Sequence, residues 1–199
     1  YYQEKIAKFV NKFLGKIAGK FISNIFFKNV EYGNRAGSRW PATLPFMCNS
    51  YSFPFIMAIT TSFLRQNGFD AEMIDCIAEQ SYSFKRLFRK VKKSKADIVI
   101  LETSTPTIDI DLYCAKMISK FAKVALAGPH ITDDTIEKLK EENPFVTYWL
   151  KGEYIKSALT MAKTQKEGVY EIEFVKNMDE MPFAARDFKG ATSYFDGHC

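Results

Sequence analysis

The stretch VALAGPH (124–130) decides the fold class of this chain. Its four leading residues, 124–127, are all apolar, and a glycine, a proline and a histidine follow them. A short apolar run without alternation is typical of a strand that is covered on both faces. Gly128 and Pro129 end such a strand abruptly, so His130 lies in the loop behind it.

Strand and helix patterns alternate on either side of this stretch. Helices are predicted at 54–64, 84–91, 109–118, 132–139 and 152–161, and strands at 71–76, 97–101, 123–127 and 146–150. This alternation predicts right-handed βαβ units. The expected fold is a Rossmann-like or flavodoxin-like α/β fold, a doubly wound parallel sheet of about five strands with flanking helices. Its first strand is either 21–27 or lies upstream of Tyr1.

Composition narrows the class of protein. The chain has 199 residues, 47% of them hydrophobic, and a net charge of +5, which suits one ordinary domain with a little extra. The basic clusters at 5–20 and 85–95 follow helical spacing without a nucleic-acid-binding motif, so we expect no nucleic acid partner. Four cysteines are scattered without metal-ligand spacing, which fits a cytoplasmic protein with free thiols. No run is long and apolar enough to span a membrane.

The first 50 residues differ from the rest. Residues 1–20 form a basic amphipathic helix pattern, which could lie on a membrane surface or, as we favour, pack on a neighbouring domain. A long irregular stretch, 29–53, contains RAGSRWP (35–41), and long loops of this kind are often functional. Both ends of the sequence suggest a piece of a longer protein.

A ligand is expected at the carboxyl ends of the strands. The segments there are 75–77, 102–107, 128–130 and 151–153, which offer hydroxyl groups, helix N-termini and glycines. They contain no acid–base pair and no nucleophile with its base. Structural interpretations stay open, since Ser and Thr cap helices, Gly-Pro makes turns and a lone histidine is usually structural. No G-x-G-x-x-G and no Walker sequence is present.

Six stretches in sequence resemble one family. They are RAGSRWP (35–41), NGFDAEMIDCIAEQ (67–80), ADIVILETSTPTIDID (96–111), VALAGPHIT (124–132), YWLKGEY (148–154) and NMDEMPFAARDF (177–188). Together they resemble the cobalamin-binding domain that precedes the barrel in many radical S-adenosylmethionine (radical SAM) enzymes. Each motif alone is weak, and the six in order cover roughly residues 30–190.

The resemblance implies a division of the chain and a ligand set. Residues 1–28 would be the N-terminal helix and a first strand, 29–165 the cobalamin-binding domain, and 166–199 a linker towards a radical SAM barrel. Cobalamin would be positioned for methyl transfer or related radical chemistry, with a [4Fe–4S] cluster and S-adenosylmethionine in the longer parent enzyme. The cofactor-binding residues would be Arg35, Ser38, Arg39, Trp40, Asp75, Thr103, Ser104, Thr105, Gly128, Pro129, His130, Gly152 and Glu153. No metal ligand and no catalytic residue is expected in this chain.

Two departures from the family pattern leave alternatives open. Ile77 and Gln80 stand where the family's Asp-x-His-x-x-Gly motif has its cobalt-ligating histidine and its glycine, so we expect no histidine of this loop on cobalt. Cys199 stands alone, without the three-cysteine motif of a radical SAM cluster. The competing interpretations are a stand-alone corrinoid carrier, a structural α/β domain that has lost its ligand, and a small nucleotide-binding module.

Overall fold

The computed structural model describes residues 53–76, 78–79, 83–105 and 107–194. Within them lies a four-stranded sheet of the order β1-β2-β3-β4 in which all neighbours are parallel. The strands are β1 (Ile98–Glu102), β2 (Lys123–Gly128), β3 (Tyr148–Lys151) and β4 (Gly168–Tyr170). The predicted doubly wound α/β fold is confirmed, and the described residues contain four of its strands.

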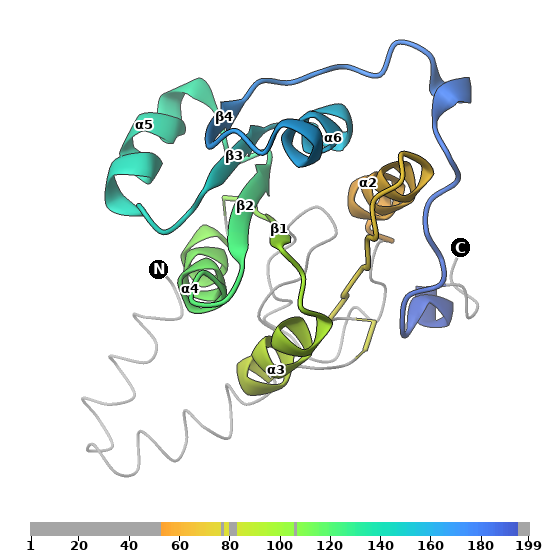
Figure 1. Cartoon of the computed structure of the whole chain (residues 1–199), viewed down its shortest axis with the longest axis horizontal. Coiled ribbons are helices and arrows are strands. Elements are labelled where there is room, and N and C mark those ends of the chain that lie inside the picture. Colours follow the sequence, from red (N-terminus) through yellow and green to blue (C-terminus); the bar gives the residue numbers. More distant parts are fainter. Residues whose placement is uncertain (1–52, 77, 80–82, 106, 195–199) are drawn as a thin grey trace, which may run out of the picture. The chain divides into compact units, whose positions relative to one another are not determined.

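Helices alternate with these strands and cover both faces of the sheet (Figure 1). They are α2 (Phe55–Gln66), α3 (Phe84–Ser94), α4 (Ile108–Ile118), α5 (Asp133–Glu142) and α6 (Ile155–Thr164). Two short 3-10 helices follow β4, at Met178–Glu180 and Ala191–Tyr194. All five helices predicted in this part of the chain are present within a few residues of their expected bounds.

The central strand β2 explains why both faces can be covered. Residues 124–127 are completely buried, and their side chains alternate between two cores. Val124 and Leu126 pack into the core beneath α3, α4 and α5. Ala125 and Ala127 belong to the second core, where their small side chains leave room for Tyr148 and the residues of α6. Burial of this kind stabilises the fold by about 25 cal/mol for each Å² of apolar surface.

The strand predicted at 71–76 is absent, which corrects the expected strand count. Residues 71–75 have no strand hydrogen bonds, and the carbonyl oxygen of Ala71 accepts a hydrogen bond of 2.6 Å from Nε of Arg65. Met73 packs instead into a third core with Ala58 and Ala185. The Arg65 side chain of α2 thus occupies the Ala71 carbonyl oxygen, which in a sheet would accept a hydrogen bond from a neighbouring strand.

The opposite error occurs after α6. Residues 166–199 are predicted as a linker, yet β4 lies within them and pairs with β3 from Tyr148↔Gly168 to Leu150↔Tyr170. β4 has only three residues and follows a solvent-exposed turn, so its apolar pattern is too short to predict a strand. The possible first strand at 21–27 lies outside the described residues.

Candidate functional site

The parallel register places the carboxyl ends of β1, β2 and β3 along one edge of the sheet. Glu102 pairs with Ala127, and Gly128 pairs with Lys151. The backbone N–H of Thr103 continues β1 by donating to the carbonyl of Ala127 over 2.7 Å. Segments 103–105, 128–130 and 151–153 therefore meet as predicted, and we call them the carboxyl edge.

Thr103 is the most informative residue of the carboxyl edge. Only 1% of its surface is exposed, and its Oγ1 has no hydrogen-bond partner among the described residues. Leaving a buried hydroxyl unsatisfied costs about 1–3 kcal/mol, so such a group calls for an explanation. A valine would fill the same space at no such cost.

The next two residues of this loop have protein partners. Ser104 Oγ and Thr107 Oγ1 lie 2.9 Å apart, and the backbone N–H of Ser104 donates to Thr107 Oγ1 at 3.2 Å. Thr105 is exposed, and its Oγ1 lies 3.1 Å from Nδ1 of His130. Ser104 therefore shapes the turn before α4, while Thr105 joins the loop after β1 to the loop after β2.

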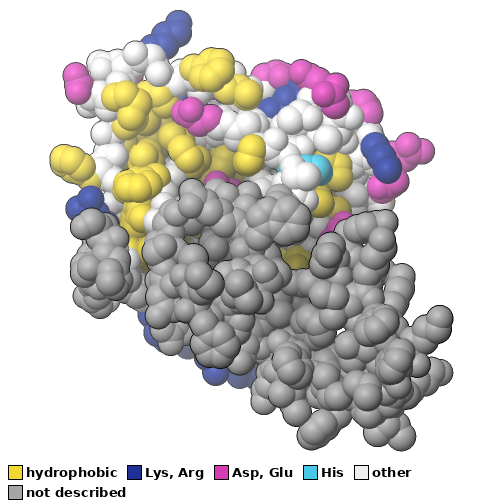
Figure 2. Space-filling view, turned by 180° about the vertical axis from the view of Figure 1, so that it is seen from behind, with side chains coloured by type: hydrophobic (Ala, Val, Ile, Leu, Met, Phe, Trp, Pro, Cys, Tyr) yellow, Lys and Arg dark blue, Asp and Glu magenta, His cyan; other side chains and the backbone are white. Residues whose placement is uncertain are grey.

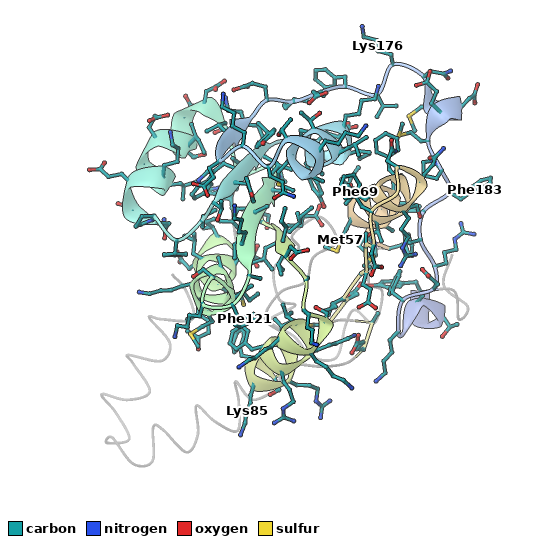
Figure 3. The ribbon with its side chains drawn as sticks, in the orientation of Figure 1. Met57, Phe69, Lys85, Phe121, Lys176 and Phe183 are labelled. Atoms are coloured by element: carbon teal, nitrogen blue, oxygen red, sulfur yellow. The ribbon has the colours of Figure 1, made fainter. Side chains whose placement is uncertain are left out.

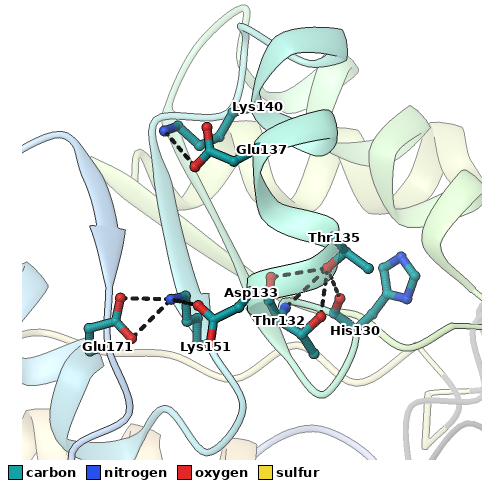
Figure 4. Close-up of polar contacts among 8 residues, drawn as sticks. All are labelled: His130, Thr132, Asp133, Thr135, Glu137, Lys140, Lys151 and Glu171. Atoms are coloured by element: carbon teal, nitrogen blue, oxygen red, sulfur yellow. Dashed lines mark hydrogen bonds and ion pairs between the residues drawn. The ribbon is translucent and has the colours of Figure 1, made fainter.

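His130 is half-buried and held from two directions. Its ring meets Thr105, and its carbonyl oxygen accepts a hydrogen bond of 2.6 Å from Thr135 Oγ1 (Figure 4). The same Thr135 oxygen accepts from the backbone N–H of Thr132, the residue that caps α5 as predicted. The histidine that follows the Gly-Pro turn is thus placed by the first turn of α5.

Gly128 is needed for a reason that the sequence did not reveal. Its φ of +119° favours glycine, and a Cβ there would lie 2.4 Å from the carbonyl oxygen of Thr103. The close approach predicted for a ligand is made by the protein's own backbone, because β1 and β2 converge at this point. Pro129 is exposed beside it.

Gly152 and Glu153 lie at the far end of the carboxyl edge. Gly152 has a φ of +50°, and a Cβ there would lie 2.7 Å from a side-chain carbon of Ile172, which follows β4. Glu153 is half-buried. Gly152 thus borders the segment that follows β4, a strand that the sequence did not predict.

Lys151 is a polar residue of this edge that sequence reasoning missed. Its side chain is 10% exposed and forms ion pairs with Asp133 of α5 and, at 2.7 Å, with Glu171 after β4 (Figure 4). The hydrogen bond to Asp133, followed by that to Glu171, raises the pKa of Lys151 above its ordinary value of 10.5. A lysine that ends a fully apolar strand was the available signal, since a buried cation requires a partner.

Asp75, another predicted cofactor-binding residue, has hydrogen-bond partners within the protein. It is 1% exposed, and its carboxylate accepts hydrogen bonds from Tyr194 Oη at 2.6 Å and from the backbone N–H of Ala78 at 3.2 Å. Through its bond to Tyr194, Asp75 anchors the chain's later residues.

Several predicted positions fall outside the described residues: Arg35, Ser38, Arg39, Trp40 and Ile77. In the part of the chain that the structure covers, no three His, Cys, Asp or Glu side chains are grouped to hold a metal ion. The same part contains no helix long and apolar enough to cross a membrane.

Comparisons with known proteins assign this chain no family, ligand or activity. No protein-family model matches the chain, and no curated protein matches its sequence. Among solved structures, the chain is similar to the N-terminal domain of a hypothetical protein of Thermotoga maritima, with 16% identity and a TM-score of 0.44. The match covers 65% of this chain and 97% of that domain.

Proposed function

We propose that this chain is a cobalamin-binding domain of the kind that precedes the barrel in radical SAM enzymes. Two independent features support the proposal. Six stretches of the sequence resemble that domain in the right order. Three of the implied ligand loops also share the carboxyl edge, where ligands of open α/β sheets bind.

The buried hydroxyl of Thr103 is the strongest structural support for the proposal. It lies at the end of β1 without a hydrogen-bond partner among the described residues, and Thr105 and His130 lie in the adjoining loops. These groups are neutral or weakly basic polar groups, which suit the amides and the nucleotide tail of a corrin better than a highly charged ligand. Thr103, Thr105 and His130 are therefore the residues expected to hold part of the ligand.

Bound cobalamin would supply methyl transfer or related chemistry, and this chain's residues would bind and orient it. A downstream barrel of the parent enzyme would provide the [4Fe–4S] cluster and S-adenosylmethionine. No described residue has the arrangement of an acid–base pair or nucleophile at the carboxyl edge. We therefore expect no catalysis from the chain alone.

A structural domain without a ligand is the competing candidate. Two observations favour it. The Thr103 carbonyl oxygen leaves no room for a side chain at Gly128, and the Asp75 carboxylate already accepts hydrogen bonds from Tyr194 and from the Ala78 N–H. Both residues would be needed whether or not a corrin binds. The two candidates differ only in what the carboxyl edge can hold.

Gel filtration with hydroxocobalamin separates these candidates. The purified chain is mixed with hydroxocobalamin, and the visible absorbance of the corrin should elute with the protein. Elution of all corrin as free ligand would support the structural domain instead.

The variant Thr103→Val tests whether the ligand binds at Thr103. Thr103→Val should weaken hydroxocobalamin binding about tenfold while leaving the free energy of unfolding equal or higher, since it removes an unsatisfied buried hydroxyl. Thr147→Val is the matched control, because Thr147 precedes β3 at the opposite edge of the sheet and should leave affinity unchanged. Equal affinity in both variants would place the ligand away from Thr103.

A further inference from the structure

A second feature lies on the outer surface of α3 and α4, away from the carboxyl edge. One side of α3 and the carboxyl-terminal end of α4 border a hollow of about 430 Å³. Its floor consists of Phe88 from α3 together with Met117 and Phe121 from α4 and the turn after it. Figure 3 shows Lys85 projecting from α3 and Phe121 on the side of α4 that faces α3. We call this hollow the α3–α4 groove.

The rim of the groove is entirely cationic. Its remaining lining residues are Lys85, Arg89, Lys92 and Lys120. None of the four forms an ion pair with a carboxylate in the described part of the chain. Figure 2 shows one face of the molecule, on which apolar side chains gather in one region and carboxylates in another. The groove thus combines an apolar floor with unpaired positive charge.

From these features we propose that the α3–α4 groove binds an acidic amphipathic helix of a partner protein. Apolar side chains at helical spacing would enter the hollow, and the flanking carboxylates would meet the rim. Met117 suits such anchors, because a thioether adapts to irregular aliphatic shapes. The chain's own segment at 1–20 contains five lysines, so its charge does not complement the rim.

Aromatic geometry favours a peptide over single-stranded nucleic acid. Base stacking needs open ring faces. The ring of Phe88 is stacked on Phe84 with centroids 6.1 Å apart, and it is tilted against Tyr113 at 6.2 Å. Phe88, one of the two aromatic residues of the floor, is therefore already engaged, while the hollow beside it accepts a projecting side chain.

Fluorescence anisotropy with defined probes tests the proposal on the whole chain. The first probe is a labelled helical peptide of about four turns, with leucines on one face and glutamates on the others. The second has lysines in place of the glutamates, and the third is a single-stranded oligonucleotide. The acidic peptide should bind, more weakly as salt screens the rim, and the other two should not. Tighter binding of the oligonucleotide, or equal binding of both peptides, would overturn the proposal.

Charge reversal on the rim provides the matched comparison. Arg89→Glu should weaken binding of the acidic peptide about tenfold. Lys163→Glu makes the same change in net charge on an exposed position of α6 and should leave affinity unchanged. Equal losses in both variants would show attraction to overall charge and refute a site at the groove. Far-ultraviolet circular dichroism of each variant excludes unfolding as the cause.

Discussion

At the scale of single residues, the carboxyl edge holds two groups with opposite requirements. The buried hydroxyl of Thr103 makes no hydrogen bond within the described residues, so the fold does not need it. At position 128, by contrast, the fold requires glycine, because there is no room for a side chain. The two residues lie against each other, since the carbonyl of Thr103 occupies the place of a Gly128 side chain. Of these two residues, Thr103 is therefore the better position at which to test for a ligand.

Gly128→Ala should destabilise the fold strongly. The positive φ costs about 1–2 kcal/mol for an L-residue, and the contact with the Thr103 backbone adds about 1–3 kcal/mol of overpacking. Gly168→Ala is the matched control, because its φ is +129° and no atom lies within 4 Å of the added Cβ. Urea unfolding of the two variants measures the difference.

This prediction affects how binding data from position 128 are interpreted. A loss of corrin binding in Gly128→Val follows from the damaged strand junction even if no ligand touches the glycine. Equal stability of Gly128→Ala and Gly168→Ala would contradict the close approach of β1 and β2 seen here.

At the scale of elements, the first turn of α5 organises the histidine loop. Thr135→Ala removes the acceptor for the Thr132 N–H and the donor to the His130 carbonyl. We expect a loss of about 1 kcal/mol in the free energy of unfolding, as for other N-terminal caps. Thr192→Ala, an exposed threonine in the last 3-10 helix, should change it little. An equally small change at Thr135 would show that α5 does not depend on this cap.

Lys151 joins three elements, β3, α5 and the segment after β4, through its ion pairs with Asp133 and Glu171. Because its pKa is raised in the folded state, its contribution to stability is complete below the ordinary value of 10.5. The contribution is lost as the pH rises through the raised pKa. Lys151→Met should therefore be less stable than the native chain at neutral pH.

The pH dependence distinguishes the ion pairs from simple packing. The stability gap between the native chain and Lys151→Met should narrow when unfolding is measured at pH values above about 10.5. Lys163→Met on the exposed face of α6 should show no such gap at any pH. A gap that stays constant in alkaline solution would assign the effect of Lys151 to its methylene groups.

At the scale of the whole described unit, the segment after β4 returns to the first helix. The backbone N–H of Ala185 donates to the carbonyl of Ala58 in α2, and Arg65 holds both carboxylate oxygens of Asp187 at 2.9 Å. The bond from Arg65 lowers the pKa of Asp187, so its contribution to stability is lost only in acid, as the pH falls through that lowered pKa. A stretch predicted as a linker is thus partly docked on the domain.

Tyr194→Phe should loosen this docked segment. The variant removes the hydrogen bond of 2.6 Å to buried Asp75, and we expect a loss of about 1–3 kcal/mol. Limited proteolysis should cut the variant faster between residues 171 and 194. Tyr113→Phe, an exposed tyrosine of α4, is the control and should be cut at the native rate. Identical cleavage in both variants would mean that the Asp75 contact does not retain the segment.

Local pattern determined the α/β class, the five helices and three of the four strands of the described residues. Periodicity and strand-ending glycines are properties of neighbouring residues, so the sequence carries them directly. The sequence also predicted that the loops after β1, β2 and β3 meet, because parallel strands end at one edge.

Long-range contacts determined the features that local pattern did not predict. The Arg65 side chain donates to the Ala71 carbonyl where a strand was predicted, and Tyr194 donates to the Asp75 carboxylate. Partners 119 residues apart leave no local pattern, so only the tertiary structure could pair them.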